Sequence, residues 1–259
     1  MPVLREYRIA MPMRVDQFKI AQRYMLCKNA DGVEYLKNEE YDFSDLPADA
    51  KCEHTGVPLG EIVGTKGTYA LKHYHTGGRV PGVVKSMFPA EAFVLHEHSY
   101  TAYPHLLTII QSGWLDFANF HIIFRSTHLD DDSGEKENPL DHDEENLGRR
   151  EVVHVDIRDA HQDPASSDYD ERYNLRKWHS EKGDVGPLEE GWEKKVKPVM
   201  CVYKSVEVLF NYWGLQGLVE STVAGQVESV VRAVHAAATA QMDEWYDLTE
   251  EEVKAMEDK

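Results

Sequence analysis

Residues 200–215 read MCVYKSVEVLFNYWGL, an alternating pattern that ends in an aromatic corner. Apart from Lys204, the even positions of this stretch are apolar or aromatic: Met200, Val202, Val206, Val208, Phe210 and Tyr212. A period of two puts alternate side chains on one face of a strand, so the pattern predicts a lysine on the buried face. A buried ammonium group needs a partner. The stretch therefore predicts a polar spot inside an apolar interior, next to an exposed aromatic tip.

The composition limits the classes of function. The chain has 259 residues, 42% of them hydrophobic, which suffices for the core of a single domain over residues 1–259. Its net charge of −18 argues against nucleic acid as a partner and against electrostatic capture by anionic membranes. The cysteines are few and lack metal-like spacing, so we expect free thiols and a cytoplasmic location, with no spanning helix and no signal peptide.

Alternating and helical patterns divide most of the chain into one sheet and a few helices. Strands are predicted at residues 3–9, 68–75, 92–100, 105–111, 119–127, 151–157 and 200–212. Helical periodicity covers 15–29 and 216–245, and a capping box from Thr249 to Glu252 begins a short terminal helix within 247–259.

Two stretches are predicted to lie outside the core. Residues 128–148 are a run of aspartates and glutamates around a single lysine, so we expect a solvated acidic loop. Their spacing lacks the glycine and glutamate positions of an EF-hand. Residues 158–197 are polar and broken by glycine and proline, which indicates a long excursion with little regular structure.

Polar side chains recur on the apolar face of the other predicted strands. Strand parity places these residues on the inner face: Lys72, Glu97, Thr101, Thr108 and Ser126. Gln22 shares a helical stripe with Phe18 and Met25. An apolar inner face that carries a polar cluster predicts a cavity for an amphiphile, with acyl chains on the walls and a charged head at the cluster. Two alternatives remain open, namely lysines that reach solvent at a sheet edge and a structural ion pair between Glu97 and Lys72 or Lys204.

A second pattern favours a different class of protein. Two His-x-His pairs occur on neighbouring predicted strands: His73, His75, His96 and His98. Such pairs supply metal ligands in small β-barrels, so a cupin-like metal-dependent enzyme is an alternative. His96 and His98 have the opposite parity to Leu95 and Glu97, which argues against an inward-facing metal site. We therefore expect no metal, no cofactor and no enzymatic activity.

Short strings along nearly the whole chain resemble the phosphatidylinositol transfer proteins of the single-domain soluble type. The matching positions are 4–8, 12, 15–16, 22, 96–97, 102–104, 186–188, 200–204, 212–216 and 247–249. The resemblance implies an α+β, START-like helix-grip fold, in which a curved, largely antiparallel β-sheet and two long helices enclose a lipid cavity. It also implies non-covalent exchange of phosphatidylinositol and phosphatidylcholine between membranes, with residues 158–197 as a regulatory loop and 247–259 as a lid.

The resemblance also implies roles for individual residues. Lys72 and Glu257 match contacts of the lipid head group. The positions that match residues near the lipid phosphate are Gln22, Glu97, Thr108 and Lys204, and strand parity adds Ser126. Tyr212 and Trp213 match a pair of tryptophans that insert into membranes, and we expect Leu215 to join them. Ser180 matches a serine of the regulatory loop and is a candidate phosphorylation site.

Two positions depart from the family pattern near the head group. Ala70 stands where the family has threonine, and Thr101 stands where it has asparagine, so fewer hydrogen-bond donors reach an inositol ring. Phosphatidylinositol and phosphatidylcholine therefore remain alternative cargoes. We expect a monomer that visits membrane surfaces transiently, and a lipid sensor or presenter that serves phosphoinositide kinases is the alternative within this fold.

Overall fold

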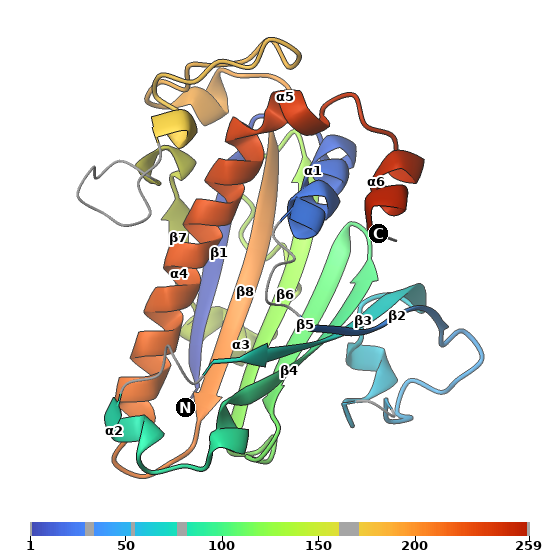
Figure 1. Ribbon diagram of the computed structural model, residues 1–259, viewed down its shortest axis with the longest axis vertical. Coiled ribbons are helices and arrows are strands. Elements are labelled where there is room, and N and C mark those ends of the chain that lie inside the picture. The colour runs from blue at the N-terminus through green and yellow to red at the C-terminus, as the bar shows by residue number, and fades with distance from the viewer. Residues whose placement is uncertain (1, 29–33, 53–54, 77–81, 161–170, 258–259) are drawn as a thin grey trace.

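The computed structural model describes residues 2–28, 34–52, 55–76, 82–160 and 171–257, and is built on one eight-stranded sheet (Figure 1). Its strands are β1 Val3–Met11, β2 Glu34–Asp42, β3 Lys66–His75, β4 Val94–Ala102, β5 His105–Ser112, β6 Phe120–Asp130, β7 Glu151–Val155 and β8 Met200–Phe210. Their order is β2-β3-β4-β5-β6-β8-β1-β7. Only the pairing of β1 with β7 is parallel, so the sheet is largely antiparallel, as expected.

The two longest helices, α1 Val15–Lys28 and α4 Gln216–Ala240, lie over one face of this curved sheet (Figure 1). The other helices are α2 Gly82–Lys85, α3 Glu144–Arg149, α5 Met242–Trp245 and α6 Glu250–Glu257, and Arg149 of α3 pairs with Glu207 on the opposite face of the sheet. Single 3₁₀ turns occur at Leu59–Glu61, Ala90–Phe93, Ile157–Asp159, Glu171–Tyr173 and Trp192–Lys194. The 25-residue α4 packs along β8 and β1, and α1 lies beside it. The expected α+β, START-like helix-grip fold is confirmed.

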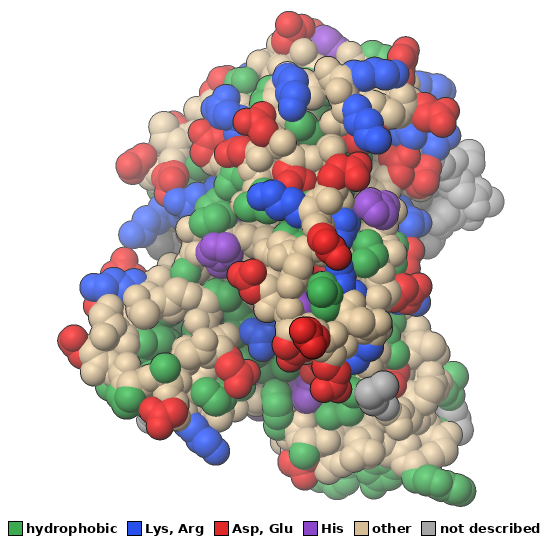
Figure 2. Space-filling model, turned by 180° about the vertical axis from the view of Figure 1, so that it is seen from behind, with side chains coloured by type: hydrophobic (Ala, Val, Ile, Leu, Met, Phe, Trp, Pro, Cys, Tyr) green, Lys and Arg blue, Asp and Glu red, His purple; other side chains and the backbone are tan. Residues whose placement is uncertain are grey.

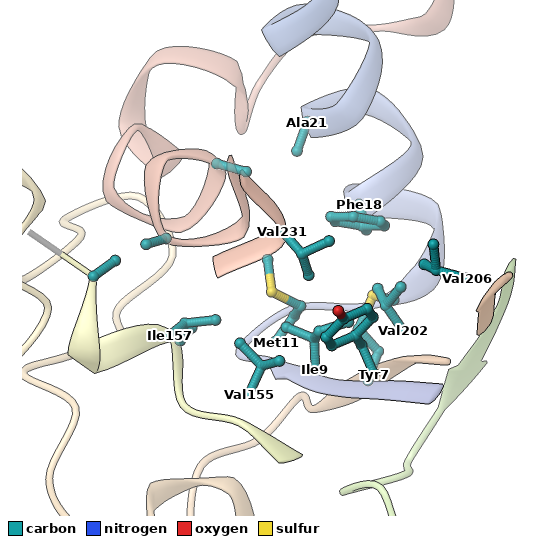
Figure 3. Close-up of a cluster of buried hydrophobic side chains, with 14 of the residues drawn as sticks. Tyr7, Ile9, Met11, Phe18, Ala21, Val155, Ile157, Val202, Val206 and Val231 are labelled. Atoms are coloured by element: carbon teal, nitrogen blue, oxygen red, sulfur yellow. The ribbon is translucent and has the colours of Figure 1, made fainter. Parts of the chain in front are cut away.

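The main core fills the space between the sheet and these two helices (Figure 3). Tyr7 and Ile9 of β1 are fully buried, and Phe18 of α1 and Val231 of α4 contact the same cluster. The apolar stripe on each helix therefore faces the apolar face of the sheet, which is what the hydrophobic effect requires of both elements. One face of the sheet thus becomes an interior.

The terminal helix α6 is held against α1 by one buried side chain and by ion pairs. Val253 is fully buried, whereas Lys19 pairs with Glu250 and Arg23 pairs with Glu257. The predicted capping box is confirmed, because Thr249 and Glu252 exchange hydrogen bonds between side chain and backbone. Since the ion pairs are partly exposed, they add little stability. The helix is therefore attached by a small interface.

The prediction of a solvated acidic loop at residues 128–148 is wrong in part. Strand β6 continues to Asp130, and α3 begins at Glu144. Asp132 is buried and accepts a 2.6 Å hydrogen bond from the Tyr203 hydroxyl, on the outer face of the sheet. Arg150, just beyond the segment, forms a 2.8 Å ion pair with the fully buried Glu6. A few buried contacts hold residues 128–148 against the sheet, and the number of charged residues in the sequence does not indicate where such contacts form.

The prediction that residues 158–197 lie outside the core is also wrong. Leu175 is fully buried, and Leu188 and Trp192 are nearly so, in the same cluster as β1 and α4. Their apolar side chains are spaced without a period of two or 3.6, so no strand or helix pattern marks them. The expectation of little regular structure is met, because the described part holds only short 3₁₀ turns.

The burial of Trp192 generates a test. We expect Trp192→Ala to lower the free energy of unfolding by about 3–5 kcal/mol, because it leaves a cavity in the core. Trp213→Ala is the matched control, since Trp213 is 99% exposed, and should change it by less than about 0.5 kcal/mol. Chemical denaturation measures both. Equal stability of the two variants would mean that residues 158–197 lie outside the core, as the sequence predicted.

Candidate functional site

An apolar cavity of about 320 Å³ lies between the inner face of the sheet and α4. Its walls are mainly aromatic and aliphatic side chains from β4, β5, β6, β8 and α4, and include Phe88, Phe93, Leu95, Ile110, Ile122, Phe124, Phe210, Val223, Val227 and Val231. Gln226 and Val230 line the cavity and are also exposed to solvent, so it opens along one edge of α4. The space suits hydrocarbon chains.

Strand register brings the predicted polar residues together on the inner face. Lys204 of β8 lies directly opposite Ser126 of β6, and Thr101 of β4 belongs to the same cross-strand row through Leu106. The Lys204 Nζ lies 5.7 Å from the ring centroid of Phe124, which lines the cavity. The polar row therefore adjoins one end of the apolar cavity.

One group of these polar side chains is satisfied within the protein. The Lys72 Nζ donates to Glu97 Oε1 at 2.9 Å, and the Ser99 hydroxyl donates to the same oxygen. Ser99 also lies 3.2 Å from the Thr108 hydroxyl. Burial alone would raise the pKa of Glu97, but the Lys72 ammonium and hydrogen bonds from Lys72, Tyr74 and Ser99 lower it. This arrangement is the buried ion pair that sequence reasoning left open.

A second group has no such partners. Within the described part of the chain, no hydrogen bond or ion pair joins the side chains of Gln22, Thr101, Ser126 or Lys204 to other protein groups. Burial lowers the pKa of Lys204 to about 8, and the Glu97 carboxylate opposes that shift. Buried polar groups are ordinarily hydrogen-bonded. An ammonium and several unpaired donors beside an apolar cavity are suited to an anionic head group.

The two departures from the family pattern lie beside these groups. Ala70 of β3 is opposite Ser99, whose hydroxyl is occupied by Glu97. Thr101 is half-buried and lies one row further along β4. Neither position supplies the longer side chain or the extra donor that the family pattern has there. Ala70 therefore adds no donor near Lys72, where the Ser99 hydroxyl is already engaged by Glu97.

Two further predicted residues lie away from this polar row. Glu257 forms a two-pronged ion pair with Arg23, with N–O distances of 2.8 and 2.7 Å, so it and Lys72 hold separate partners. Ser180 is fully buried, and its hydroxyl donates to Asp243 Oδ1 at 2.5 Å. A kinase cannot reach a buried hydroxyl. Phosphorylation of Ser180 would therefore require its loop to leave Asp243.

The predicted aromatic tip is exposed at the end of β8. Trp213 is 99% exposed, and Tyr212 is 40% exposed. Leu215 does not join this tip as predicted, because its side chain is half-buried against the core. Leu218, in the first turn of α4, is 48% exposed. The buried Glu220 carboxylate accepts from the Phe210 backbone N–H at 3.0 Å and thereby ties α4 to the end of β8.

Two other loops join this tip. Met87 and Trp114, which follow α2 and β5, are 54% and 52% exposed. The ring of Phe88 packs edge-on against Trp114 at 6.2 Å and against Tyr212 at 4.9 Å, and it also lines the cavity. Figure 2 shows hydrophobic side chains along this end of the molecule. We call Met87, Trp114, Tyr212, Trp213 and Leu218 the apolar tip. An exposed apolar patch of this kind marks an interaction surface.

The histidines do not form one cluster. The rings of His73 and His96 stack at 4.1 Å on the outer face, while His98 is buried with its Nδ1 3.0 Å from the Tyr69 hydroxyl and His75 is exposed. Among the described residues, no three His, Cys, Asp or Glu side chains converge as metal ligands would. The arrangement does not support the cupin-like alternative.

Sequence reasoning missed three residues of this region. His128 lies two residues after Ser126 on the inner face, and extending the parity argument to the true end of β6 would have found it. Met87 and Trp114 lie in loops, where no periodicity distinguishes an exposed side chain from a buried one. Only the meeting of three loops gives them a shared surface.

The fold and the site define a class of protein: an α+β protein with an internal apolar cavity, a cationic end to that cavity and an apolar tip near its walls. In the described part of the chain, no helix has both the length and the apolarity needed to cross a bilayer. Comparison with known proteins narrows this class.

The sequence profile of the phosphatidylinositol transfer protein family matches residues 2–259. The cytoplasmic phosphatidylinositol transfer protein 1 of Drosophila melanogaster is 33% identical over 257 residues, which cover 99% of this chain and 88% of that protein. The phosphatidylinositol transfer protein beta isoform of Mus musculus is 32% identical over 272 residues, covering 100% of this chain and 92% of the relative. Phosphatidylinositol transfer protein 1 of Dictyostelium discoideum is 32% identical over 264 residues, covering 98% and 91%. The chain belongs to the phosphatidylinositol transfer protein family.

The low pKa of Lys204 generates a second test. We expect Lys204→Met to stabilise the lipid-free protein at pH 7 by about 1–3 kcal/mol, because methionine avoids the cost of desolvating an ammonium group. The pKa of Lys204 falls from 10.5 to about 8 on folding, so the unfolded chain binds more protons between these values. Wild-type stability should rise relative to that of the variant as pH increases through this window.

Chemical denaturation of delipidated protein at pH 7 and pH 10 measures both effects. Ser205→Ala serves as the control, because Ser205 is the next residue of β8 and faces the other side of the sheet. A wild type more stable than Lys204→Met at pH 7 would mean that Lys204 has a stabilising partner.

Proposed function

We propose that the protein binds one phospholipid in the internal cavity and exchanges it between membranes. The observation that carries the proposal is the junction of an apolar cavity with an ammonium group that has no carboxylate within ion-pair distance in the described residues. An apolar ligand alone would leave Lys204 unpaired, and a small anion alone would leave the apolar walls unfilled. A phospholipid supplies both chemistries in one molecule.

The acyl chains would occupy the apolar walls of the cavity. Each methylene group removed from water contributes about 0.8 kcal/mol, so two long chains supply most of the binding free energy. The walls come mainly from four strands and α4, and most of their side chains are apolar. Affinity therefore arises chiefly from the chains, and the polar end decides which head group is accepted.

The phosphate would lie at Lys204, with Gln22 and Ser126 as donors, whereas Thr101 lies three strands away from Lys204, toward the head group. The phosphodiester charge offsets the cost of the desolvated ammonium and raises the lowered pKa of Lys204. Glu97, Thr108 and Lys72 would lie further toward the head group as a network already bonded to itself. Ala70 favours a cargo with little demand for donors there, such as phosphatidylcholine, over phosphatidylinositol.

Exchange would begin at the apolar tip. A net charge of −18 opposes electrostatic attraction to anionic membranes, so docking would depend on insertion of apolar side chains. Phe88 touches the tip and the cavity wall together, which gives the inserted loops a path to loosen the wall. The small interface of α6 with α1 lets that helix act as a lid.

The remaining properties follow from this role. The protein would act as a cytoplasmic monomer on transient visits to membranes, with the phospholipid as cargo and with neither a cofactor nor covalent chemistry. The relatives are named as transfer proteins, and two of them as cytoplasmic. A sensor or presenter for kinases would keep its lipid instead of exchanging it.

The cargo prediction is tested by mass spectrometry of lipid that copurifies with the protein. We expect about one phospholipid per chain, with phosphatidylcholine exceeding phosphatidylinositol. Val227→Trp should reduce the occupancy severalfold, since Val227 lines the cavity and an added indole overfills it. Val234→Trp should not, because Val234 is 48% exposed and lies outside the lining. Protein that carries no phospholipid would refute the proposal.

The docking prediction concerns the apolar tip. We expect Trp114→Ala with Trp213→Ala to slow lipid transfer between vesicles about tenfold or more, because less apolar area enters the membrane, while loading is unchanged. Leu46→Ala is the control, since Leu46 is 53% exposed but lies between β2 and β3. Transfer of fluorescent phospholipid measures the rate. Undiminished transfer by the double variant would rule out this tip, and a loaded wild type that never exchanges would favour the sensor.

A further inference from the structure

His128 lies two residues beyond Ser126 on β6, next to the polar row, and has no assigned role so far. It belongs to the inner face of β6, opposite Val202, and is 3% exposed. Its ring packs edge-on against Phe18 of α1 and against Tyr103, each with a centroid distance of 5.1 Å. Phe18 therefore fixes the ring from the helix side, and the strand fixes it from below.

The ring nitrogens of His128 have no hydrogen-bond partner among the described residues. Nδ1 is shielded from solvent and unpaired, and no hydrogen bond to Nε2 is formed within that part of the chain. Most buried imidazoles satisfy at least one nitrogen, so this situation needs an explanation. The histidine has the same unpaired character as its neighbours Ser126 and Lys204.

The other histidine of this region is used differently. His235 of α4 stacks on Phe18 at 5.7 Å, and its Nδ1 donates to the Val231 carbonyl at 2.6 Å. Burial, opposed by that hydrogen bond and reinforced by Lys204, lowers the pKa of His235 to about 4. A neutral His235 with its proton on Nδ1 has only a lone pair on Nε2. It is an acceptor and cannot bind an anion.

Among the described residues, the groups that act most strongly on the pKa of His128 are neutral or positive. Burial lowers its pKa well below the usual value, and Lys204 of β8, His235 of α4 and His105 of β5 lower it further. The ring is therefore neutral in the lipid-free protein and carries one N–H. Because a proton on the shielded Nδ1 would have no acceptor, the better position is Nε2, which leaves an N–H to offer to a ligand.

The spacing of His128 and Lys204 suits one phosphate group. Ser126 is directly opposite Lys204, and His128 is opposite Val202, so His128 and Lys204 are diagonal neighbours on the same face. Diagonal pairs on antiparallel strands are separated by about 7–8 Å, and a phosphate that accepts from both side chains fits between them. A second donor beside the ammonium would hold two oxygens of the same group.

We propose that His128 is a phosphate-binding residue, whose Nε2–H donates to a non-bridging oxygen of the phosphodiester held by Lys204. Phe18 is the positioning residue that sets the angle of the ring. The inference rests on the proposed function and deepens it, because it assigns recognition of the phosphodiester itself, independent of the alcohol attached to it. It also distinguishes phospholipids from neutral glycerolipids with the same chains.

The experiment compares His128→Phe with wild type in binding two lipids that differ only in the phosphate-containing head. Phenylalanine keeps the ring and its packing against Phe18 but removes both nitrogens. Each protein is equilibrated with vesicles that contain dioleoyl phosphatidylcholine or dioleoylglycerol, and bound lipid is measured by mass spectrometry. We expect about tenfold or greater loss of phosphatidylcholine binding, with dioleoylglycerol binding unchanged.

His121→Phe is the matched control, because His121 lies on the same strand but on the outer face, against Phe117. It should bind both lipids as wild type does. In wild type, ¹⁵N spectra of the His128 ring should show Nε2 protonated and shifted when phosphatidylcholine is loaded, and unshifted with dioleoylglycerol.

Several outcomes would overturn the inference. Equal loss of both lipids in His128→Phe would mean that the residue only supports packing. Full binding of phosphatidylcholine by a folded His128→Phe would mean that the ring nitrogen makes no contact with phosphate, while the proposed function would stand. A wild type that takes up no phospholipid would overturn the inference and the proposed function together.

Discussion

An ammonium group held on the inner face of a sheet, with no carboxylate at ion-pair distance in the described residues, is the constraint on which the rest of this structure depends. Lys204 is desolvated by burial, and Glu97, the carboxylate that opposes the resulting pKa shift, is already bonded to Lys72. Such a charge costs several kcal/mol unless a ligand compensates it. Enclosure by α1 and α4 therefore carries a desolvation cost at Lys204, and an anionic amphiphile offsets that cost while filling the cavity.

Strand β8 connects the proposed phosphate site with the apolar tip that is proposed to dock on membranes. Lys204 occupies its middle, and Phe210 at its end contacts Phe88 and Tyr212. Glu220 bonds to the Phe210 backbone from α4, so the strand, the tip and the first turns of the helix are mechanically linked. Membrane contact at the tip can therefore act on the wall of the cavity, whereas the phosphate end stays anchored in the sheet. Membrane docking and phosphate binding therefore take place at different positions along the same strand.

Much of the fold and part of the site could be predicted from the sequence, because successive side chains of a strand point to opposite faces of the sheet. Parity alone placed Lys204, Ser126 and Glu97 on one inner face, and the register confirmed that face. The same reasoning misplaced residues 158–197, where apolar side chains such as Trp192 enter the core without any period. It also missed Trp114, since a loop residue has no neighbours in sequence that reveal its exposure.

The sequence by itself determined which side of the predicted strands faces inward, where the two long helices and the terminal helix begin, and that a charged residue would lie among apolar ones. Those properties depend on local periodicity and on capping, which act over a few residues. Only the tertiary structure decided which polar groups satisfy one another. Glu97 accepts from Lys72 and leaves Lys204 unpaired because the strand register puts Lys72 directly opposite Glu97. Hydrogen bonding is short-ranged and directional, so a shift of one residue in register would change the partners while leaving the hydrophobic composition untouched.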